Sequence, residues 1–429
     1  MATRPAREPV KPNDAVWLQD SATNRMVIHG IYSTDHISLE EARAVFQTRV
    51  IEAEGGTRYP RFRRRTVRER GRWYWEDDPD FDMARHMVRS PLEGHVTADR
   101  LQDYIAAIAH EPLAADRPPW RIEYMEHFEV GQSAFLVRIH HAMADGVAFV
   151  PVIFAMMDEL EPGNPVPADV GRAPGSLLGA AVLASLAAPA VLLRRVFWRP
   201  DRHALHGPSV GGRKRVAWTR ALPLAEVKRV KNLFGATVND VLMALVSGAI
   251  ANHLETSAGQ RRRHIHISMP VNMRAAGATL RMENRFAAVP LTLPMSPREL
   301  PGRIAAVKAR MDALKAGLDP LVIYGTVNVF LTALPYAVSR WLIDFFANKC
   351  SCVITNLPGP PVALAMAGRR LRSLMFWVPQ RADIGVGISI LTFAGNVQVG
   401  VIADTSVLED PNDLVRAIEE EFEAMRHHR

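Results

Sequence analysis

Two adjacent histidines, His140 and His141, end an apolar run and are followed by Asp145 and Gly146 in the stretch RIHHAMADGVAF. A histidine held in an apolar cavity suits a general base, because imidazole can take a proton from an alcohol, an amine or a thiol near neutral pH. Gly146 permits a tight turn into a following helix. Asp145 lies in that turn, where it can pair with an arginine or fix the local backbone.

Two other interpretations of these residues stay open. A histidine satisfied within the core, with an aspartate that caps a helix, fits the same pattern. A zinc site fits it less well, because His-His-x3-Asp lacks the HExxH spacing and no third group of His or Cys ligands lies nearby in the chain. We therefore expect no metal site.

The strand expected before the histidines separates their roles. Alternate residues of a strand point to opposite faces. His141 therefore shares a face with Val137 and Ile139, whereas His140 shares the other face with Arg138. The alternation predicts that His141 faces an apolar interior and that His140 does not reach the same cavity.

The surrounding segments mix strands with helices, which predicts an α/β or α+β protein with two sheets. Helix starts are indicated by a Ser38–Glu41 capping box, by Thr97, and by a second box at Thr237 and Asp240. The expected helices span 38–54, 97–110, 147–160, 222–235 and 237–254, with a long helical pair over 297–349 and a last helix from 409. The expected strands are 24–33, a hairpin around residues 131–132, 263–273, 286–295, 351–360, 371–379, and a hairpin over 384–403 that turns at Gly395-Asn396.

Two Pro/Gly-rich stretches, 161–175 and 201–215, bracket an apolar segment and indicate the division of the chain. We expect an N-terminal half at 1–160, a linker with the apolar segment at 161–215, and a C-terminal half at 216–429.

The apolar stretches 175–193 and 320–339 approach transmembrane length, but proline and small residues interrupt them. We interpret them as buried or membrane-surface helices. The first is followed by Arg194, Arg195, Trp198 and Arg199, a pattern typical of surface attachment in which the arginines meet anionic headgroups.

The composition is that of a globular protein of 429 residues with a net charge of +7, which allows anionic partners. We interpret the arginine-rich run RFRRRTVRERGRWYW as an exposed edge strand or loop and expect no nucleic-acid partner, because no nucleic-acid-binding signature accompanies it. Cys350 and Cys352 are expected to be reduced thiols, and no signal peptide is visible, so a cytoplasmic location is expected.

The HHxxxDG pattern resembles the motif of the CoA-dependent acyltransferase superfamily, which includes chloramphenicol acetyltransferase and peptide-synthetase condensation domains. The stretches RPPW, TVNDVLMA, SMPVNMR, NRFAAVPLTLP, TNLPGPP and GVGISILTFAGNVQVGVIAD occur in an order similar to that of the bacterial wax ester synthase/diacylglycerol acyltransferase family. The resemblance covers nearly the whole chain. Pro119, where leucine is more usual, and TNLPGP, for the usual Ser-Asn-Val-Pro-Gly-Pro, are mild departures.

The resemblance implies two chloramphenicol-acetyltransferase-like halves around a central tunnel. It implies that His141 is the general base, that Asp145 is structural and that His140 is supportive. Asn239, matched to the Asn-Asp pair of the family, stands in the first turn of a helix, where N–H groups and a partial positive charge could stabilise a thioester oxyanion. For Asp240 we prefer simple capping. The residues expected to bind substrate are Gly146, Trp120, Asn356, Pro358 and Gly359.

These inferences predict an enzyme that moves a long-chain acyl group from acyl-CoA to a fatty alcohol or diacylglycerol, with no cofactor and no covalent acyl-enzyme. We expect it on the surface of the inner membrane or of lipid bodies. One alternative is the same fold with another acceptor, such as a polyketide or an amino compound. A second alternative is a lipid-body or membrane-surface binding protein without turnover.

Overall fold

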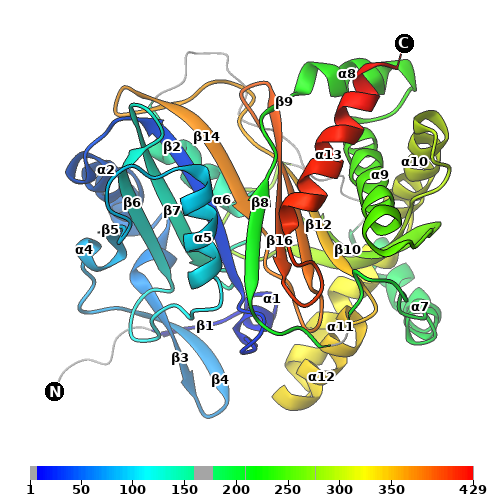
Figure 1. Cartoon of the computed structure of the whole chain (residues 1–429). Coiled ribbons are helices and arrows are strands. Elements are labelled where there is room, and N and C mark those ends of the chain that lie inside the picture. The colour runs from blue at the N-terminus through cyan, green and yellow to red at the C-terminus, as the bar shows by residue number, and fades with distance from the viewer. Residues whose placement is uncertain (1–6, 159–176, 208, 276, 429) are drawn as a thin grey trace.

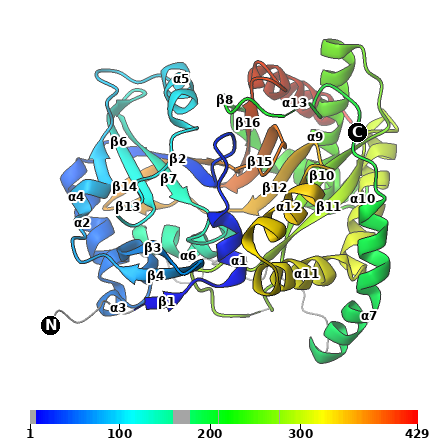
Figure 2. The same cartoon turned by 90° about the horizontal axis from the view of Figure 1, so that it is seen from below.

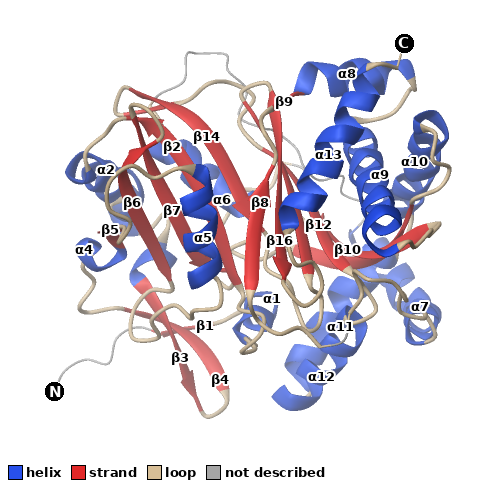
Figure 3. Ribbon diagram, in the orientation of Figure 1, coloured by secondary structure: helices blue, strands red, loops and turns tan. Residues whose placement is uncertain are grey.

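The computed structural model describes residues 7–158, 177–207, 209–275 and 277–428, and it contains two large mixed β-sheets that lie side by side with helices packed against them (Figures 1 and 3). A third, three-stranded sheet projects from the N-terminal side. The α+β class with one sheet in each half is therefore confirmed.

The N-terminal sheet has six strands in the order β13-β14-β2-β7-β6-β5. Only β5 and β6 run parallel, and β6 and β7 form the hairpin expected around Gly131. The expected caps at Ser38 and Thr97 start α2 and α5. The bounds are β2 (Val27–Asp35), β5 (Met87–Arg89), β6 (Trp120–Phe128), β7 (Gln132–His140), β13 (Ala365–Met366), β14 (Arg369–Trp377), α2 (Leu39–Phe46), α5 (Ala98–Ile108) and α6 (Gly146–Met156).

The C-terminal sheet has the order β11-β10-β12-β15-β16-β8, with β9 paired to β16. Its central helix, α9, is almost completely buried and packs against α10 and α13. The bounds are β8 (Lys214–Trp218), β9 (Leu222–Pro223), β10 (His264–Asn272), β11 (Phe286–Pro294), β12 (Cys352–Pro358), β15 (Val386–Phe393), β16 (Asn396–Asp404), α8 (Leu224–Leu233), α9 (Val238–Ala258), α10 (Leu300–Ala316) and α13 (Pro411–Arg426).

A segment from the later part of the chain joins the N-terminal sheet. Strands β13 and β14 belong to the later part of the sequence, yet β14 pairs with β2 at the edge of the N-terminal sheet. The expected division at residue 216 is therefore not a division between sheets, and β8 already begins at Lys214. The Pro/Gly-rich residues 161–175 lie outside the described part of the chain.

The region 297–349 forms three helices instead of the expected pair: α10, α11 (Asp319–Ala333) and α12 (Tyr336–Ala347). Pro335 is the N-cap of α12, and a proline cannot continue the preceding helix. The β15–β16 hairpin turns at Ala394 and Gly395, one residue earlier than expected, and both residues have left-handed backbone (φ 45° and 80°). Such a pair matches the twist of a two-residue hairpin.

The arginine-rich run forms a hairpin of β3 (Arg64–Glu69) and β4 (Arg72–Asp77), joined at one edge by β1 (Arg7–Pro9). Two arginines of β3 are paired with acids of β4, Arg65 with Glu76 at 2.7 Å and Arg64 with Asp77 at 2.8 Å. The expectation of an exposed strand is wrong for much of the run, because β3 is half-buried, Trp75 and Glu76 of β4 are buried, and Arg61 at the start of the run is buried against Asp14. Short helices complete the fold: α1 (Pro12–Ala15), α3 (Ala53–Gly56), α4 (Met83–His86), two 3-10 turns (Val16–Leu18 and Pro60–Arg63) and a π-helical turn (Gln47–Ile51).

The first apolar stretch forms α7 (Leu177–Val196), which packs against α11 on the side of the molecule where α12 also lies (Figure 2). Within the described ranges, no helix taken singly combines the length and apolar character that membrane crossing requires. Two bent helix pairs, α8 with α9 and α10 with α11, meet that requirement by length and composition.

Candidate active site

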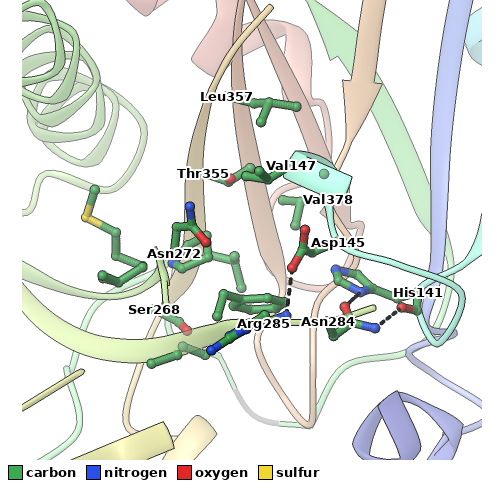
Figure 4. Close-up of a pocket in the computed structure, with 18 of the residues that line it drawn as sticks. His141, Asp145, Val147, Ser268, Asn272, Asn284, Arg285, Thr355, Leu357 and Val378 are labelled. Carbon is green, nitrogen blue, oxygen red and sulfur yellow. Dashed lines mark hydrogen bonds between the residues drawn. The ribbon is translucent and has the colours of Figure 1, made fainter. Parts of the chain in front are cut away.

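A cavity of about 1520 Å³ lies between the two halves, and its wall is predominantly apolar. Strand β7 contributes Val137 and Ile139 to this wall, α9 contributes Asn239, and β12 contributes Asn356. His141 lines the same cavity (Figure 4). The strand alternation therefore places His141 on the apolar, inward face, as predicted.

His141 is held tightly at the end of β7. Its backbone N–H donates to the carbonyl oxygen of Met26 at 2.7 Å, and its ring stacks on the Trp17 ring with centroids 3.9 Å apart. The side chain is buried. Burial lowers the pKa of His141 to about 4, because the charged imidazolium loses its hydration, so the ring is neutral at pH 7.

Asn284 determines which nitrogen of His141 carries the proton. Its Nδ2 donates to Asp14 Oδ1 at 2.9 Å and to the carbonyl oxygen of His141 at 2.8 Å. These two acceptors fix the orientation of the amide, so its Oδ1, 3.0 Å from His141 Nδ1, accepts a hydrogen bond. His141 therefore carries its proton on Nδ1, and Nε2 is left with a lone pair that can accept a proton.

A buried ion pair supports Asn284 from behind. Asp14 accepts from the backbone N–H of Asn284 at 2.7 Å and from Arg61 Nη2 at 2.6 Å. Arg61 also donates to the carbonyl oxygen of Met143 at 2.7 Å, which fastens the turn after the histidines. The sequence predicted none of these three residues for the site, although Asn284 begins the NRFAAVPLTLP stretch that carries part of the family resemblance.

Asp145 anchors the same turn. Its Oδ1 accepts from the Ala148 N–H at 2.9 Å and caps α6, and its Oδ2 accepts from Arg274 Nη1 and from the Arg285 N–H, each at 2.8 Å (Figure 4). The expected arginine pair is thus present, and it joins α6 to the segment between β10 and β11. The acceptor for the His141 Nδ1–H is therefore Asn284 Oδ1 and not Asp145.

His140 points away from the cavity, as its position on the strand predicts. Its Nδ1 accepts from the Ala142 N–H at 3.2 Å, and its Nε2 lies 3.4 Å from Asp20 Oδ1. Gly146 lines the cavity but has no left-handed backbone. An added Cβ at Gly146 would lie 3.2 Å from a methyl group of Leu357, a tight contact that this flexible side chain would have to relieve.

The Asn239–Asp240 pair begins α9. Asp240 and Thr237 form the expected capping box, with reciprocal bonds of 2.9 and 3.2 Å. Asn239 lines the cavity, and its Oδ1 accepts from Asn356 Nδ2 at 3.0 Å. Because its carbonyl oxygen is used, the group that Asn239 can offer to a substrate is its NH2 donor.

Three residues expected to bind substrate do not line this cavity. Trp120 is buried in the N-terminal core, where its ring stacks on His86 at 4.5 Å and its Nε1 donates to the carbonyl oxygen of Phe62 at 2.9 Å. Pro358 ends β12, and Gly359 lies so close to the carbonyl oxygen of Thr392 that no Cβ fits. Their positions indicate packing roles.

Solved structures with the same architecture are acyltransferases and related condensation domains. The chain superposes on the wax ester synthase/diacylglycerol acyltransferase from Marinobacter aquaeolei VT8 with a TM-score of 0.69 at 19% identity, covering 97% of this chain and 98% of that one. It superposes on the first condensation domain of the calcium-dependent antibiotic synthetase with a TM-score of 0.61 at 17% identity, covering 98% and 97%. The chain therefore shares its two-halved fold with these solved structures.

Sequence comparison identifies the family within that class. The model of the wax ester synthase/diacylglycerol acyltransferase catalytic domain matches residues 10–197, and the model of the WS/DGAT C-terminal domain matches residues 282–426. The probable diacylglycerol O-acyltransferase tgs1 of Mycobacterium tuberculosis (strain ATCC 25618 / H37Rv) is 27% identical over 379 residues, which cover 81% of this chain and 80% of that protein. The chain belongs to the wax ester synthase/diacylglycerol acyltransferase family, and it is an acyltransferase.

Proposed function

We propose that this protein transfers a long-chain acyl group from acyl-CoA to the hydroxyl group of a fatty alcohol or diacylglycerol, giving a wax ester or a triacylglycerol, with His141 as the general base. The observation that carries the proposal is the tautomer of His141. Asn284 holds the proton on Nδ1, which leaves Nε2 as a proton acceptor at the wall of a large apolar cavity. The cavity exceeds the roughly 300–1,000 Å³ of ordinary small-molecule sites, as two lipid substrates require.

The proposed reaction has two proton transfers and no covalent enzyme intermediate. Nε2 of His141 takes the hydroxyl proton as the acceptor oxygen attacks the thioester carbonyl carbon. The tetrahedral intermediate then breaks its carbon–sulfur bond, and the protonated His141 returns the proton to the CoA thiolate. Burial makes the imidazolium short-lived, because it has lost its hydration. Holding both substrates in one cavity supplies much of the rate by orientation.

The NH2 group of Asn239 is the proposed donor to the oxyanion. It stands in the first turn of α9, where the unpaired N–H groups of a helix create a partial positive charge. Asn356 supports this role by donating to Asn239 Oδ1, which directs the Asn239 NH2 group away from that bond.

Acceptor identity is supported by the names of the relatives, which include diacylglycerol O-acyltransferases and a wax ester synthase. The test is an acceptor panel: release of CoA thiol from palmitoyl-CoA with hexadecanol, with dioleoylglycerol, with an amine and with a polyketide-like secondary alcohol. Release with the first two supports the proposal. Release only with the amine or the polyketide-like alcohol would assign another acceptor, and no release with any acceptor would favour a lipid-binding protein without turnover.

We also propose a peripheral position on the inner membrane or on lipid bodies, held mainly by apolar side chains. Ten of the twelve large hydrophobic residues exposed in the described chain lie on α7, just after it, or on α11 and α12. Val182, Leu186 and Leu193 of α7 and Phe197, just after its end, recur at helical spacing and so form one stripe. Helices α7 and α11 pack together, so this apolar surface lies on one side of the molecule (Figure 2).

Two of the arginines at the end of α7 make ion pairs within the protein. Arg194 and Arg195 both pair with Asp319 of α11, at 2.6 and 2.7 Å, and Arg195 also lies over the Trp198 ring. One carboxylate thus faces two guanidinium groups, and the Arg194 side chain is 62% exposed, so positive charge remains at this end of α7. Of the three arginines expected to meet lipid headgroups, Arg199 is the exposed one for which no such ion pair is found in the described part of the chain.

Vesicle sedimentation tests the attachment. Replacing Leu186, Phe197 and Trp341, which are 75, 74 and 64% exposed, with serine should abolish binding to phosphatidylcholine/phosphatidylglycerol vesicles. Leu233→Ser removes an apolar residue that is 47% exposed on α8 and should leave binding unchanged. Binding that disappears in high salt, yet survives the triple serine change, would show that charge and not the apolar surface holds the protein on the membrane.

A further inference from the structure

A group of histidines and one aspartate lies in the C-terminal half, apart from His141. Asp201 lies five residues after the end of α7, and His264 and His266 are the first and third residues of β10. We call Asp201, His264 and His266 the Asp–His cluster. Because residues two apart on a strand point to the same face, both histidines face the same way, and their rings are stacked with centroids 5.5 Å apart.

The donor atoms of the Asp–His cluster converge. One carboxylate oxygen of Asp201 and one ring nitrogen of each histidine lie within 4.8 Å of one another, and Asp201 Oδ1 is 3.3 Å from His266 Nδ1. Zinc bonds to nitrogen and oxygen are about 2.0–2.2 Å, so the donors of a tetrahedral site are about 3–4 Å apart. Small side-chain rotations would bring all three atoms to that spacing.

One buried nitrogen of the cluster forms no hydrogen bond with any described residue. His266 is 6% exposed, and its Nδ1 makes no hydrogen bond to any described residue although the Asp201 carboxylate lies near it. An unsatisfied nitrogen is unfavourable in a buried position. A cation between the Asp201 oxygen and His266 Nδ1 would satisfy both groups.

Hydrogen bonds from neighbouring residues orient the side chains of the cluster, as such bonds orient the ligands in metal proteins. Asp201 Oδ2 accepts from the His266 N–H at 2.7 Å and from Ser351 Oγ at 2.6 Å, and His203 Nε2 lies 3.2 Å from the same oxygen. These contacts orient the carboxylate and leave Oδ1 for a ligand. The Trp198 ring packs on the His266 ring, with centroids 4.0 Å apart, and restricts its rotation.

We propose that Asp201, His264 and His266 bind one divalent transition-metal ion of the zinc type, with water completing the coordination. Two imidazoles and one carboxylate suit zinc, whereas magnesium and calcium prefer oxygen ligands alone. The ion fastens the segment after α7 to the start of β10. Since Leu192 and Arg195 of α7 line the acyltransferase cavity, the ion also steadies one wall of it.

This proposal revises the expectation of no metal site, which rested on the spacing around His140 and His141. The Asp–His cluster escapes a spacing search because its ligands come from two segments more than 60 residues apart in the sequence. Only the folded chain brings Asp201 beside the two histidines.

Zinc titration of untagged, chelator-treated full-length protein tests the site, with ZnCl2 as the probe and calorimetry as the measurement. We expect the parent protein to bind one zinc ion per chain. His264→Gln should bind zinc at least tenfold more weakly, and Asp201→Asn should bind no zinc. His264 is exposed, so the glutamine variant should fold normally. His95→Gln, which changes an exposed histidine elsewhere, is the matched control and should bind zinc as the parent protein does.

Thermal unfolding gives a second measurement that does not depend on enzyme activity. Zinc should raise the unfolding midpoint of the parent protein and of His95→Gln by roughly 2–4 °C, and it should leave His264→Gln unchanged. Cobalt(II) should bind at the same site and give visible absorption bands in the parent protein and in His95→Gln, but not in His264→Gln. Absence of stoichiometric zinc binding, or zinc binding that is equal in the parent protein and in His264→Gln, would overturn the proposal.

Discussion

Asn284→Ala tests the inference that an amide, and not a carboxylate, orients the catalytic histidine. The change removes the acceptor 3.0 Å from His141 Nδ1, together with two hydrogen bonds that the same side chain donates to Asp14 and to the His141 carbonyl oxygen. The buried Nδ1–H of His141 is then left without its acceptor. The reactive tautomer, with Nδ1 protonated and Nε2 free, loses the interaction that favours it.

The size of the effect follows from the cost of the lost bond. Leaving a buried donor unsatisfied costs about 1–3 kcal/mol. Raising the free energy of the reactive tautomer by about 1.4 kcal/mol lowers its population, and so the rate, by a factor of ten. We therefore expect kcat to fall by roughly 10- to 100-fold, whereas the KM for acyl-CoA should change by less than about threefold, because the loss acts on the chemical step.

The assay is steady-state release of CoA thiol at a temperature where the variant is fully folded by circular dichroism. Asn24→Ala is the matched control, because Asn24 is 1% exposed, donates to the carbonyl oxygens of Ala382 and Ile384, and does not line the cavity. It should lower the thermal midpoint and leave kcat nearly unchanged. A folded Asn284→Ala enzyme with kcat within twofold of the parent enzyme would refute the positioning role of Asn284.

Three further predictions concern this site, and a fourth concerns the Asp–His cluster. His141→Ala should lower acyl transfer by roughly 10²–10⁴-fold without unfolding the protein, and activity within a few-fold of the parent would exclude the base. Because burial lowers the pKa of His141 to about 4, kcat/KM should stay level from pH 8 down to about pH 5 and fall only below that, whereas an acid limb near pH 6.5 would indicate an ordinary, hydrated histidine. Asp145→Asn should lower the free energy of unfolding by about 3 kcal/mol and also lower activity, because Arg274 loses its buried partner; unchanged stability with a shifted pH profile would assign Asp145 an electrostatic role instead. EDTA should leave the initial rate of acyl transfer unchanged while lowering the thermal midpoint. A rate that falls with EDTA and recovers with added metal would show that the metal takes part in the reaction.

The lowered pKa of His141 also predicts the pH dependence of stability. The unfolded chain takes up the proton near pH 6.5, and the folded chain does so only near pH 4. Stability is therefore lost as the pH falls through this window, by up to about 3 kcal/mol from this residue. Urea unfolding at pH 7 and pH 5 should show a smaller difference for His141→Ala than for the parent protein; equal differences would mean that His141 is hydrated in the folded state.

The sequence was sufficient where the determining contacts are local. Period-two alternation separated His141 from His140, because strand geometry alone decides which face a side chain takes. The capping boxes at Ser38 and Thr237 were also correct, since each depends on residues three apart in the chain. The order of the motifs along the chain, through their resemblance to a known family, predicted the fold and the family.

Contacts between distant segments could not be predicted in this way. Asn284 reaches His141 across 143 residues, and Arg274 reaches Asp145 across 129. No spacing rule connects such pairs. Trp120 was expected at the cavity because it ends a family motif, yet its apolar ring is better satisfied in the core beside His86. The crossing of β14 into the N-terminal sheet is likewise a tertiary event without a local signal.

The HHxxxDG stretch supplies both the base, His141, and the aspartate, Asp145, whose contacts hold the turn after it in place. His141 and Asp145 come from the N-terminal half, but their partners Asn284, Arg274 and Arg285 all come from the β10–β11 connection of the C-terminal half. The tautomer of His141 therefore depends on the docking of the two halves, which the crossing of β14 reinforces. The two halves must pack together both to fix the His141 tautomer and to enclose the cavity. The reactive nitrogen and the lipid-binding cavity therefore form together.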